Sequence, residues 1–181
     1  MLIASGAMVA GVGFSGAPAF ADGPNTPPEV VATVEAAAWP ELEEGQKRWE
    51  VSVVKFLLFD LGYLDVVHAD EYFDERMTEA VKAYQEDREI EPTGVVGTQT
   101  WKALSDDLGL VQRGHSGNKV KAVQQALIGG YKYDLVLDGE FGPATQEAVE
   151  DFQRAQGIDD DGIVGPITFK ALITPDDTTL G

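Results

Sequence analysis

The segments DGEFGPATQEAV (residues 138–149) and DGIVGPITFKAL (residues 161–172) decide how this chain folds. Both begin with Asp-Gly, carry an apolar residue at the fourth position, continue with Gly-Pro, and have Thr and Ala at matching places. An Asp-Gly pair favours a turn in which glycine takes a positive φ. Pro143 and Pro166 suit the first position of a helix, where the missing N–H loses no partner. Each segment therefore predicts a turn, one inward-facing side chain (Phe141 or Val164) and the start of a helix.

These segments belong to a longer internal repeat, which has to be identified before the fold is interpreted. Residues 70–104 align with residues 138–172 without a gap, and residues 45–58 align with residues 114–127. Many aligned positions are identical in both copies. Examples are the pairs Asp70/Asp138, Phe73/Phe141, Ala80/Ala148, Gln85/Gln153, Gly94/Gly162, Gly97/Gly165, Thr100/Thr168 and Leu104/Leu172. The repeat predicts two tandem units, at residues 39–107 and 108–174.

Hydrophobic spacing predicts helices in each unit. Val51, Val54, Leu58 and Leu61 recur at intervals of three and four, which is typical of one apolar helix face. The corresponding residues of the second unit repeat the pattern, and a short third helix is expected at residues 100–104 and 168–172. The predicted fold is therefore all-α, with two tandem small three-helix domains. The segment that joins them, residues 105–114, is short and compatible with helix, so we expect the two units to pack rigidly.

The two ends of the chain have a different composition. Residues 1–21 carry no charge and end in Ala-Phe-Ala, which predicts a secretory signal peptide and a secreted protein. Residues 22–38 contain three prolines and then an Ala-rich run, so we expect a linker that leads into a small helical segment. Residues 175–181 are predicted to be a C-terminal tail without a membrane anchor.

The net charge of the chain argues against some classes of binding partner. There are 31 acidic and only 13 basic residues, for a formal net charge of −18. Such a surface repels nucleic acid phosphates and anionic lipid headgroups. We therefore expect neither nucleic acid nor a membrane as a partner.

The chain is poor in the residues that many hydrolytic enzymes use. It has no cysteine, so thiolate chemistry and disulfides are excluded, and its two histidines, His68 and His115, occupy unlike positions of the two units. No G-x-S-x-G segment is present, and few residues lie outside the repeats to build the apolar pocket that a glycosidase carboxyl group needs. Asp159–Gly162 lacks the alternation of an EF-hand loop and predicts a solvated acidic loop. We expect no catalysis, no metal and no cofactor.

The second unit resembles a known family. Its segment RGHSGNKVKAVQQAL (residues 113–127), followed by the two Asp-Gly segments, is similar to the peptidoglycan-binding module of the PG-binding-1 type, found in many bacterial cell-wall hydrolases. Residues that match the family pattern are Gly114, Gly117, Val120, Gln124, Asp138, Gly139, Phe141, Gly142, Thr145, Ala148, Val149, Phe152, Gln153, Asp161, Gly162, Val164, Gly165, Thr168 and Leu172. Phe169 stands where the family favours Trp.

The first unit departs from the pattern. Its closing segment TGVVGTQTWKAL (residues 93–104) keeps the family Trp at Trp101. The D-G-x-F-G segment, however, has become DEYFD (residues 70–74), and the usual Leu-Gln has become Val54-Lys55. The resemblance thus implies an intact second unit and a degenerate first unit.

The resemblance further implies a non-catalytic module that binds peptidoglycan, whose sugars, amides and stem-peptide carboxylates suit backbone N–H groups with aromatic and amide side chains. The candidate ligand-binding residues all lie in the second unit: Tyr131, Asp138, Gly139, Phe141, Gly142, Thr145, Gln153 and Asp161. A purely structural role competes at each position, with Phe141 and Phe152 as core residues and Gly139 and Gly162 as positive-φ residues.

Two functions remain open at this point. One is a secreted, non-catalytic protein that binds the peptidoglycan of the cell wall. The other is a secreted accessory or assembly subunit, in which the same fold binds another secreted protein. The eroded first unit and the net charge of −18 favour the second function, whereas the intact second unit favours the first.

Overall fold

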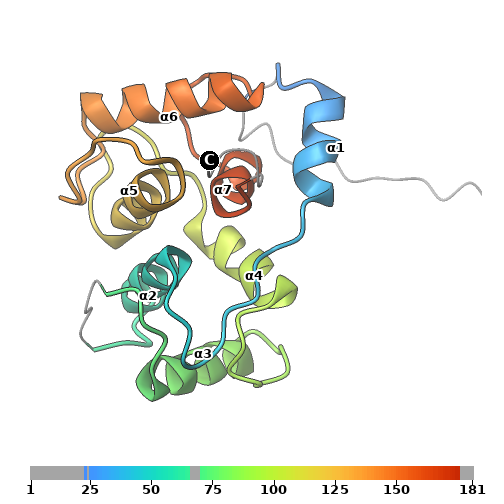
Figure 1. Ribbon diagram of the computed structural model, residues 1–181, viewed down its shortest axis with the longest axis vertical. Coiled ribbons are helices and arrows are strands. Elements are labelled where there is room, and N and C mark those ends of the chain that lie inside the picture. Colours follow the sequence, from blue (N-terminus) through green and yellow to red (C-terminus); the bar gives the residue numbers. More distant parts are fainter. Residues whose placement is uncertain (1–22, 24, 66–69, 176–181) are drawn as a thin grey trace, which may run out of the picture.

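The computed structural model describes residues 23, 25–65 and 70–175, and within them seven helices form and no β-sheet does (Figure 1). The predicted signal peptide, the C-terminal tail beyond Pro175 and His68 lie outside these residues. In chain order the helices are α1 (Pro28–Ala36), α2 (Trp49–Asp60), α3 (Glu75–Asp87), α4 (Thr98–Leu108), α5 (Asn118–Tyr131), α6 (Pro143–Gln156) and α7 (Pro166–Ile173). The first unit contains α2 to α4 and the second contains α5 to α7, which confirms the all-α fold of two three-helix units. None of the described helices is both long and apolar enough to cross a membrane.

The repeat of the sequence is also a repeat of the structure. Isolated antiparallel bridges join Leu42 to Val96 and Lys47 to Tyr72 in the first unit. In the second unit they join Val111 to Val164 and Ser116 to Glu140, at the aligned positions. Each bridge ties the segment in front of a unit's first helix to one of its two turn segments.

The two turn segments behave as their residues predict. Gly139 and Gly162 adopt φ values of +79° and +72°. Pro143 and Pro166 are the first residues of α6 and α7. Phe141 is 2% exposed and Val164 is fully buried, so both side chains reach the core as expected.

Helix α4 is longer than the five residues that the sequence analysis expected for the third helix. It runs on for 11 residues because Leu104, Ser105 and Leu108 continue its buried face. It ends where Gly109 takes a φ of +64°. The last turn of α4 therefore lies across the predicted boundary between residues 107 and 108.

The segment expected to be a linker contributes a packed helix. Helix α1 lies against α7, Val34 is buried, and the Lys170 ammonium donates a 2.5 Å hydrogen bond to the carbonyl oxygen of Glu35. Trp39, just after α1, stacks on Trp101 of the first unit, with ring centroids 5.6 Å apart. The described part of residues 22–38 thus joins the fold rather than spanning a gap.

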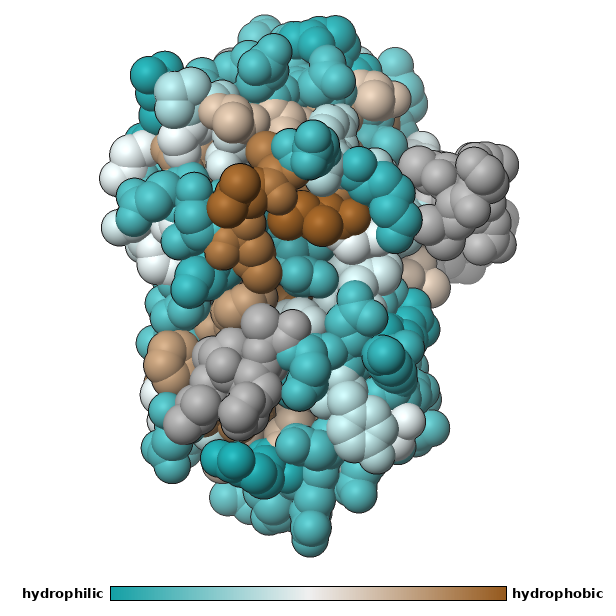
Figure 2. All heavy atoms as spheres, turned by 60° about the vertical axis from the view of Figure 1, so that its left-hand side comes forward, coloured by the Kyte–Doolittle hydropathy of each residue, from teal (hydrophilic) through white to brown (hydrophobic). Residues whose placement is uncertain are grey.

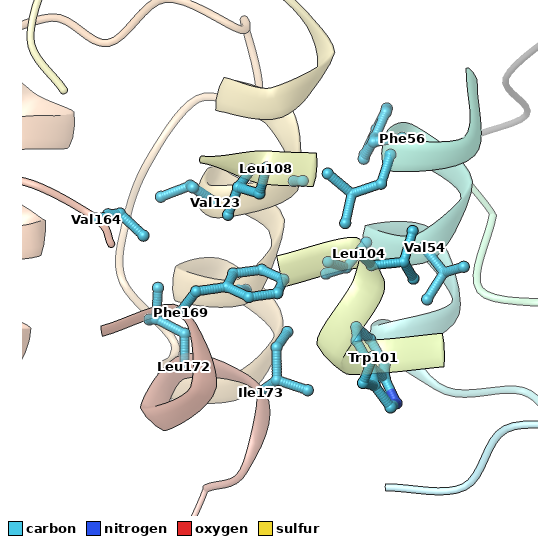
Figure 3. Packing of buried hydrophobic residues seen from close by; sticks show 14 of the residues in the cluster. Val54, Phe56, Trp101, Leu104, Leu108, Val123, Val164, Phe169, Leu172 and Ile173 are labelled. Carbon is cyan, nitrogen blue, oxygen red and sulfur yellow. The ribbon is translucent and has the colours of Figure 1, made fainter. Parts of the chain in front are cut away.

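The two units share one hydrophobic core. Helix α2 packs against α5 more extensively than any other pair of helices pack, and residues 50–58 of α2 are all buried. A helix that is buried on all sides needs neighbours on every face, and α5 supplies the face that the first unit leaves open. Figure 3 shows residues of both units within one cluster, among them Val54 and Leu104 of the first unit and Val123 and Phe169 of the second. The two units are thus packed against each other, and the expected rigidity stays a prediction.

One face of the molecule can be seen in Figure 2, and it is mostly polar. Hydrophilic residues cover most of the face shown in Figure 2, and hydrophobic residues gather in one band across it. Among the described residues, the exposed large hydrophobic side chains are Tyr72, Leu110 and Val136.

Candidate functional site

A buried glutamine fastens the first turn of the second unit. Gln124 of α5 is 1% exposed, and its amide nitrogen donates to an Asp138 carboxylate oxygen (2.8 Å), the Glu140 carbonyl (3.2 Å) and the Thr145 hydroxyl (3.1 Å). Its amide oxygen accepts from the Gly139 N–H at 2.8 Å. We call this group, made of Gln124, Asp138, Gly139, Glu140 and Thr145, the Gln124 clasp. Every member contacts Gln124, so the clasp holds the turn to α5 and to the start of α6.

The second turn of the same unit repeats the arrangement one helix later. Gln153 of α6 is fully buried and donates to Asp161 (3.0 Å), the Ile163 carbonyl (2.9 Å) and the Thr168 hydroxyl (3.2 Å). The Gly162 N–H donates to the Gln153 amide oxygen at 2.9 Å. We call this group the Gln153 clasp. The recurring Asp-Gly formula thus marks two turns that are each held by a glutamine from the preceding helix.

The first unit keeps one clasp and replaces the other. Gln85 donates to the Val95 carbonyl (2.8 Å) and the Thr100 hydroxyl (2.9 Å) and accepts from the Gly94 N–H (2.9 Å). At the position of Gln124 stands Lys55, whose ammonium donates to Asp70 (2.5 Å) and to the Tyr72 carbonyl (2.6 Å). In the degenerate first unit, the Lys55–Asp70 ion pair therefore holds the turn that the Gln124 amide holds in the second unit.

The structure divides the predicted site residues among these groups. Asp138, Gly139 and Thr145 belong to the Gln124 clasp, and Gln153 and Asp161 belong to the Gln153 clasp. Each of these five residues forms hydrogen bonds within the chain. Gln124 and Lys55, which hold the two first turns, were not among the predicted site residues, although Gln124 was part of the recognised pattern.

The remaining predicted residues lie elsewhere. Phe141 is a core residue. Tyr131 packs edge-on against Phe152, with ring centroids 4.7 Å apart, and its hydroxyl donates to the Ala171 carbonyl at 2.6 Å. Gly142 precedes α6 and has open space where a Cβ would lie. The eight residues therefore do not converge on one pocket.

The electrostatics of the Gln124 clasp favour a charged Asp138. The hydrogen bond from Gln124, and after it the one from the Glu140 N–H, lower the pKa of Asp138 below its ordinary value of 3.8. Asp138 remains solvent-exposed, so its carboxylate needs no ion partner to stay charged. The carboxylate serves the turn as a hydrogen-bond acceptor.

A cleft of about 730 Å³ lies where the two units meet. We call it the inter-unit cleft. It is lined by residues 37, 38 and 40 after α1, residues 47–50 and 71 of the first unit, and residues 129, 132 and 173–175 of the second. The basic side chains of Lys47, Arg48 and Lys132 lie around it. Sequence reasoning missed this cleft, because its walls come from five separate stretches of the chain.

Metal ligands do not gather in the part of the chain that the structure describes. No three or more His, Cys, Asp or Glu side chains are placed there to hold a metal ion. His115 is exposed in the turn before α5.

Comparison with known families finds one domain twice. The peptidoglycan binding domain PG_binding_1 matches residues 49–104 and 116–172, which together make up more than half of the chain. The two matched ranges coincide with the two structural units.

Two curated relatives contain related sequence. The chain is 32% identical over 146 residues to N-acetylmuramoyl-L-alanine amidase CwlM of Mycobacterium tuberculosis. The aligned region covers 71% of this chain and 36% of the amidase. It is 40% identical over 87 residues to the zinc D-Ala-D-Ala carboxypeptidase of Streptomyces albus G. This aligned region covers 46% of this chain and 32% of the carboxypeptidase. The chain thus spans about a third of the length of these relatives.

A solved structure is also similar over part of the chain. It is a peptidoglycan-binding protein from Clostridioides difficile in complex with glutamine hydroxamate, 39% identical, with a TM-score of 0.34. The match covers 36% of this chain and 41% of that protein. With both units matched over their helices and turns, the chain belongs to the PG_binding_1 family of peptidoglycan binding domains, which it carries as two tandem copies.

Proposed function

We propose that this protein is a secreted, non-catalytic protein that binds peptidoglycan in the bacterial cell wall. The observation that carries the proposal is the double family match, which falls on two units with equivalent turns and bridges. The second unit has both glutamine clasps complete, so its turn segments keep the family's form.

The names of the two relatives also support peptidoglycan as the ligand. They are named for N-acetylmuramoyl-L-alanine and for D-Ala-D-Ala, and both groups occur in peptidoglycan. The proposal that this chain is non-catalytic rests on its composition, because a chain without cysteine and with two histidines offers few nucleophiles or zinc ligands. Secretion rests on the uncharged residues 1–21.

A protein-binding role is the second candidate. It is favoured by one observation, the replacement of the first unit's Gln-Asp-Gly clasp by Lys55, Asp70 and Glu71. A unit freed from the family pattern can bind a different partner.

The test is retention of the whole chain on purified insoluble peptidoglycan from which anionic polymers have been removed, with insoluble cellulose as the control matrix. Separated units are unsuitable, because α2 and α5 bury each other's apolar faces. Retention on peptidoglycan and not on cellulose supports the proposal. Absence of retention at every salt concentration contradicts it and favours a protein partner. If repulsion by the net charge of −18 limits binding, retention will increase with salt.

A further inference from the structure

The inter-unit cleft has the size and the wall structure of a ligand site. Its volume of about 730 Å³ lies within the range of roughly 300–1,000 Å³ that is usual for small-molecule pockets. Both units and the segment after α1 contribute walls. A single copy of the domain therefore lacks the cleft, and only the tandem pair builds it.

The charge at the cleft is opposite to that of the chain as a whole. Over the full sequence acidic residues outnumber basic ones by 31 to 13. Around the cleft basic residues outnumber acidic ones, because Lys47, Arg48 and Lys132 line it together with only two acidic residues, Glu50 and Glu71. This local excess of positive charge attracts an anionic group to a surface that otherwise repels one.

Arg48 is held at the edge of the cleft by a buried acid. Glu50 is only 2% exposed, and it accepts a 3.2 Å hydrogen bond from Arg48 Nε as well as a contact from Arg48 Nη2. The guanidinium carries five N–H donors in a fixed plane, so it can bind Glu50 and a second carboxylate at once. Lys132, across the cleft, donates from its ammonium to the Gly129 carbonyl at 2.6 Å.

Residues 47–50 and 71 of the first unit, which line the cleft, all differ in type from their counterparts in the second unit. Lys47, Arg48, Trp49 and Glu50 align with Ser116, Gly117, Asn118 and Lys119, and Glu71 aligns with Gly139. The bridges at Lys47 and Ser116 show that the alignment holds in space. Two of the departures from the family pattern, Arg48 and Glu71, thus lie at the cleft, whereas Lys55 and Asp74 lie outside it. The cleft therefore has a chemistry that the second unit does not repeat.

The mixture of charges indicates the class of ligand. A polymer of phosphate groups would meet Glu50 and Glu71 as well as the basic residues, and the acids would repel it. A peptide with a free carboxylate and amide or amino groups can use both signs, and the indole of Trp49 offers it a flat apolar wall. We propose that the inter-unit cleft binds the carboxylate-bearing stem peptide of peptidoglycan, an inference that rests on the proposed function.

The test measures binding of a soluble fragment to the whole chain by isothermal titration calorimetry at low salt. The probe is a disaccharide tetrapeptide released from peptidoglycan. The same disaccharide without peptide, and poly(glycerol phosphate), serve as comparison ligands. The variant Lys47→Gln/Lys132→Gln removes two exposed positive charges and leaves the Arg48–Glu50 pair intact. The variant Arg76→Gln/Lys82→Gln removes the same charge from α3 and is the matched control.

We expect the tetrapeptide fragment to bind the unmodified chain and the α3 variant alike, and to bind the cleft variant at least about tenfold more weakly. Lys47→Arg/Lys132→Arg should retain binding. Binding should weaken as salt rises, because here opposite charges attract.

Three results overturn the inference. Equal binding of the fragment by the cleft variant excludes this cleft, and retention of the unmodified chain on insoluble peptidoglycan then leaves the proposed function standing. Equal binding of the peptide-free disaccharide or of poly(glycerol phosphate) excludes the stem peptide as the group recognised. Failure of the unmodified chain to bind insoluble peptidoglycan contradicts the proposed function and this inference together.

Discussion

Trp49 of the first unit lies directly on Gly129 of the second. A Cβ added at Gly129 would lie 2.7 Å from the Trp49 Cβ, and one added at Gly130 would lie 3.0 Å from the indole Cζ2. Real Cβ atoms essentially never approach as closely as the first of these distances. Two glycines in the last turn of α5 therefore make room for the residue that begins α2, and this contact closes one wall of the inter-unit cleft.

Gly129→Ala should lower the free energy of unfolding by roughly 1–2 kcal/mol, although alanine is the better helix former, because overpacking against Trp49 outweighs the gain in helix propensity. Urea denaturation measures the change. In a Trp49→Gly background the neighbouring Cβ is gone, so the same substitution should be neutral or stabilising. A Gly129→Ala variant that is more stable than the parent would show that the two helices can separate easily.

The two units should unfold together. Residues of both belong to one buried cluster, and α2 is buried largely by α5, so neither unit can lose its structure without exposing the core of the other. Differential scanning calorimetry of the whole chain should show one transition, with equal calorimetric and van't Hoff enthalpies. Two resolved transitions would mean that the units are independent domains.

Replacing the clasp glutamines by leucine should destabilise the protein to different degrees. Gln124→Leu and Gln153→Leu each take away the acceptor of a buried glycine N–H and a donor to a carboxylate, at a cost of about 1–3 kcal/mol. Gln85→Leu should cost less, because the Gln85 amide donates to two neutral groups, the Val95 carbonyl and the Thr100 hydroxyl, whereas the other two glutamines each also donate to a carboxylate. Chemical denaturation of the three variants gives the order. A larger loss for Gln85→Leu would contradict the stabilising role of the two carboxylates.

Asp138 should make stability depend on pH in the acid range. Because its folded pKa lies below 3.8, the charged carboxylate stabilises the fold at all pH values above 3.8, and this contribution is lost as the pH falls through the lowered folded pKa. The stability difference between the parent and Asp138→Asn should therefore be constant near neutrality and shrink in acid. Unfolding curves from pH 7 down to the acid transition measure it, and a difference that does not change with pH would contradict the assignment.

The sequence predicts the local features of the fold well. Pro143 and Pro166 begin helices as expected, Gly139 and Gly162 take positive φ, and the repeat of residues 70–104 at 138–172 is a repeat in space. These features depend on a few neighbouring residues. The length of α4 was underestimated because Ser105 and Leu108 are buried by packing that the short motif does not contain.

The candidate site was harder to predict. Asp138 and Asp161 have the residue type of ligand-binding groups, yet their carboxylates accept hydrogen bonds from Gln124 and Gln153. A motif shows which residues recur but not whether their polar atoms are used within the chain.

The sequence alone determined the helical class, the two tandem units, the turn glycines and the positions at which helices begin, because these follow from side-chain size, backbone freedom and apolar spacing along one stretch of chain. The tertiary structure alone decided that α2 and α5 share a core, that α1 packs on α7, and that Lys47, Arg48 and Lys132 surround one cleft. These arrangements bring together residues far apart in the sequence, such as Lys47 and Lys132, which are 85 positions apart. They depend on the packing of whole helices against one another, which no single stretch of the sequence encodes.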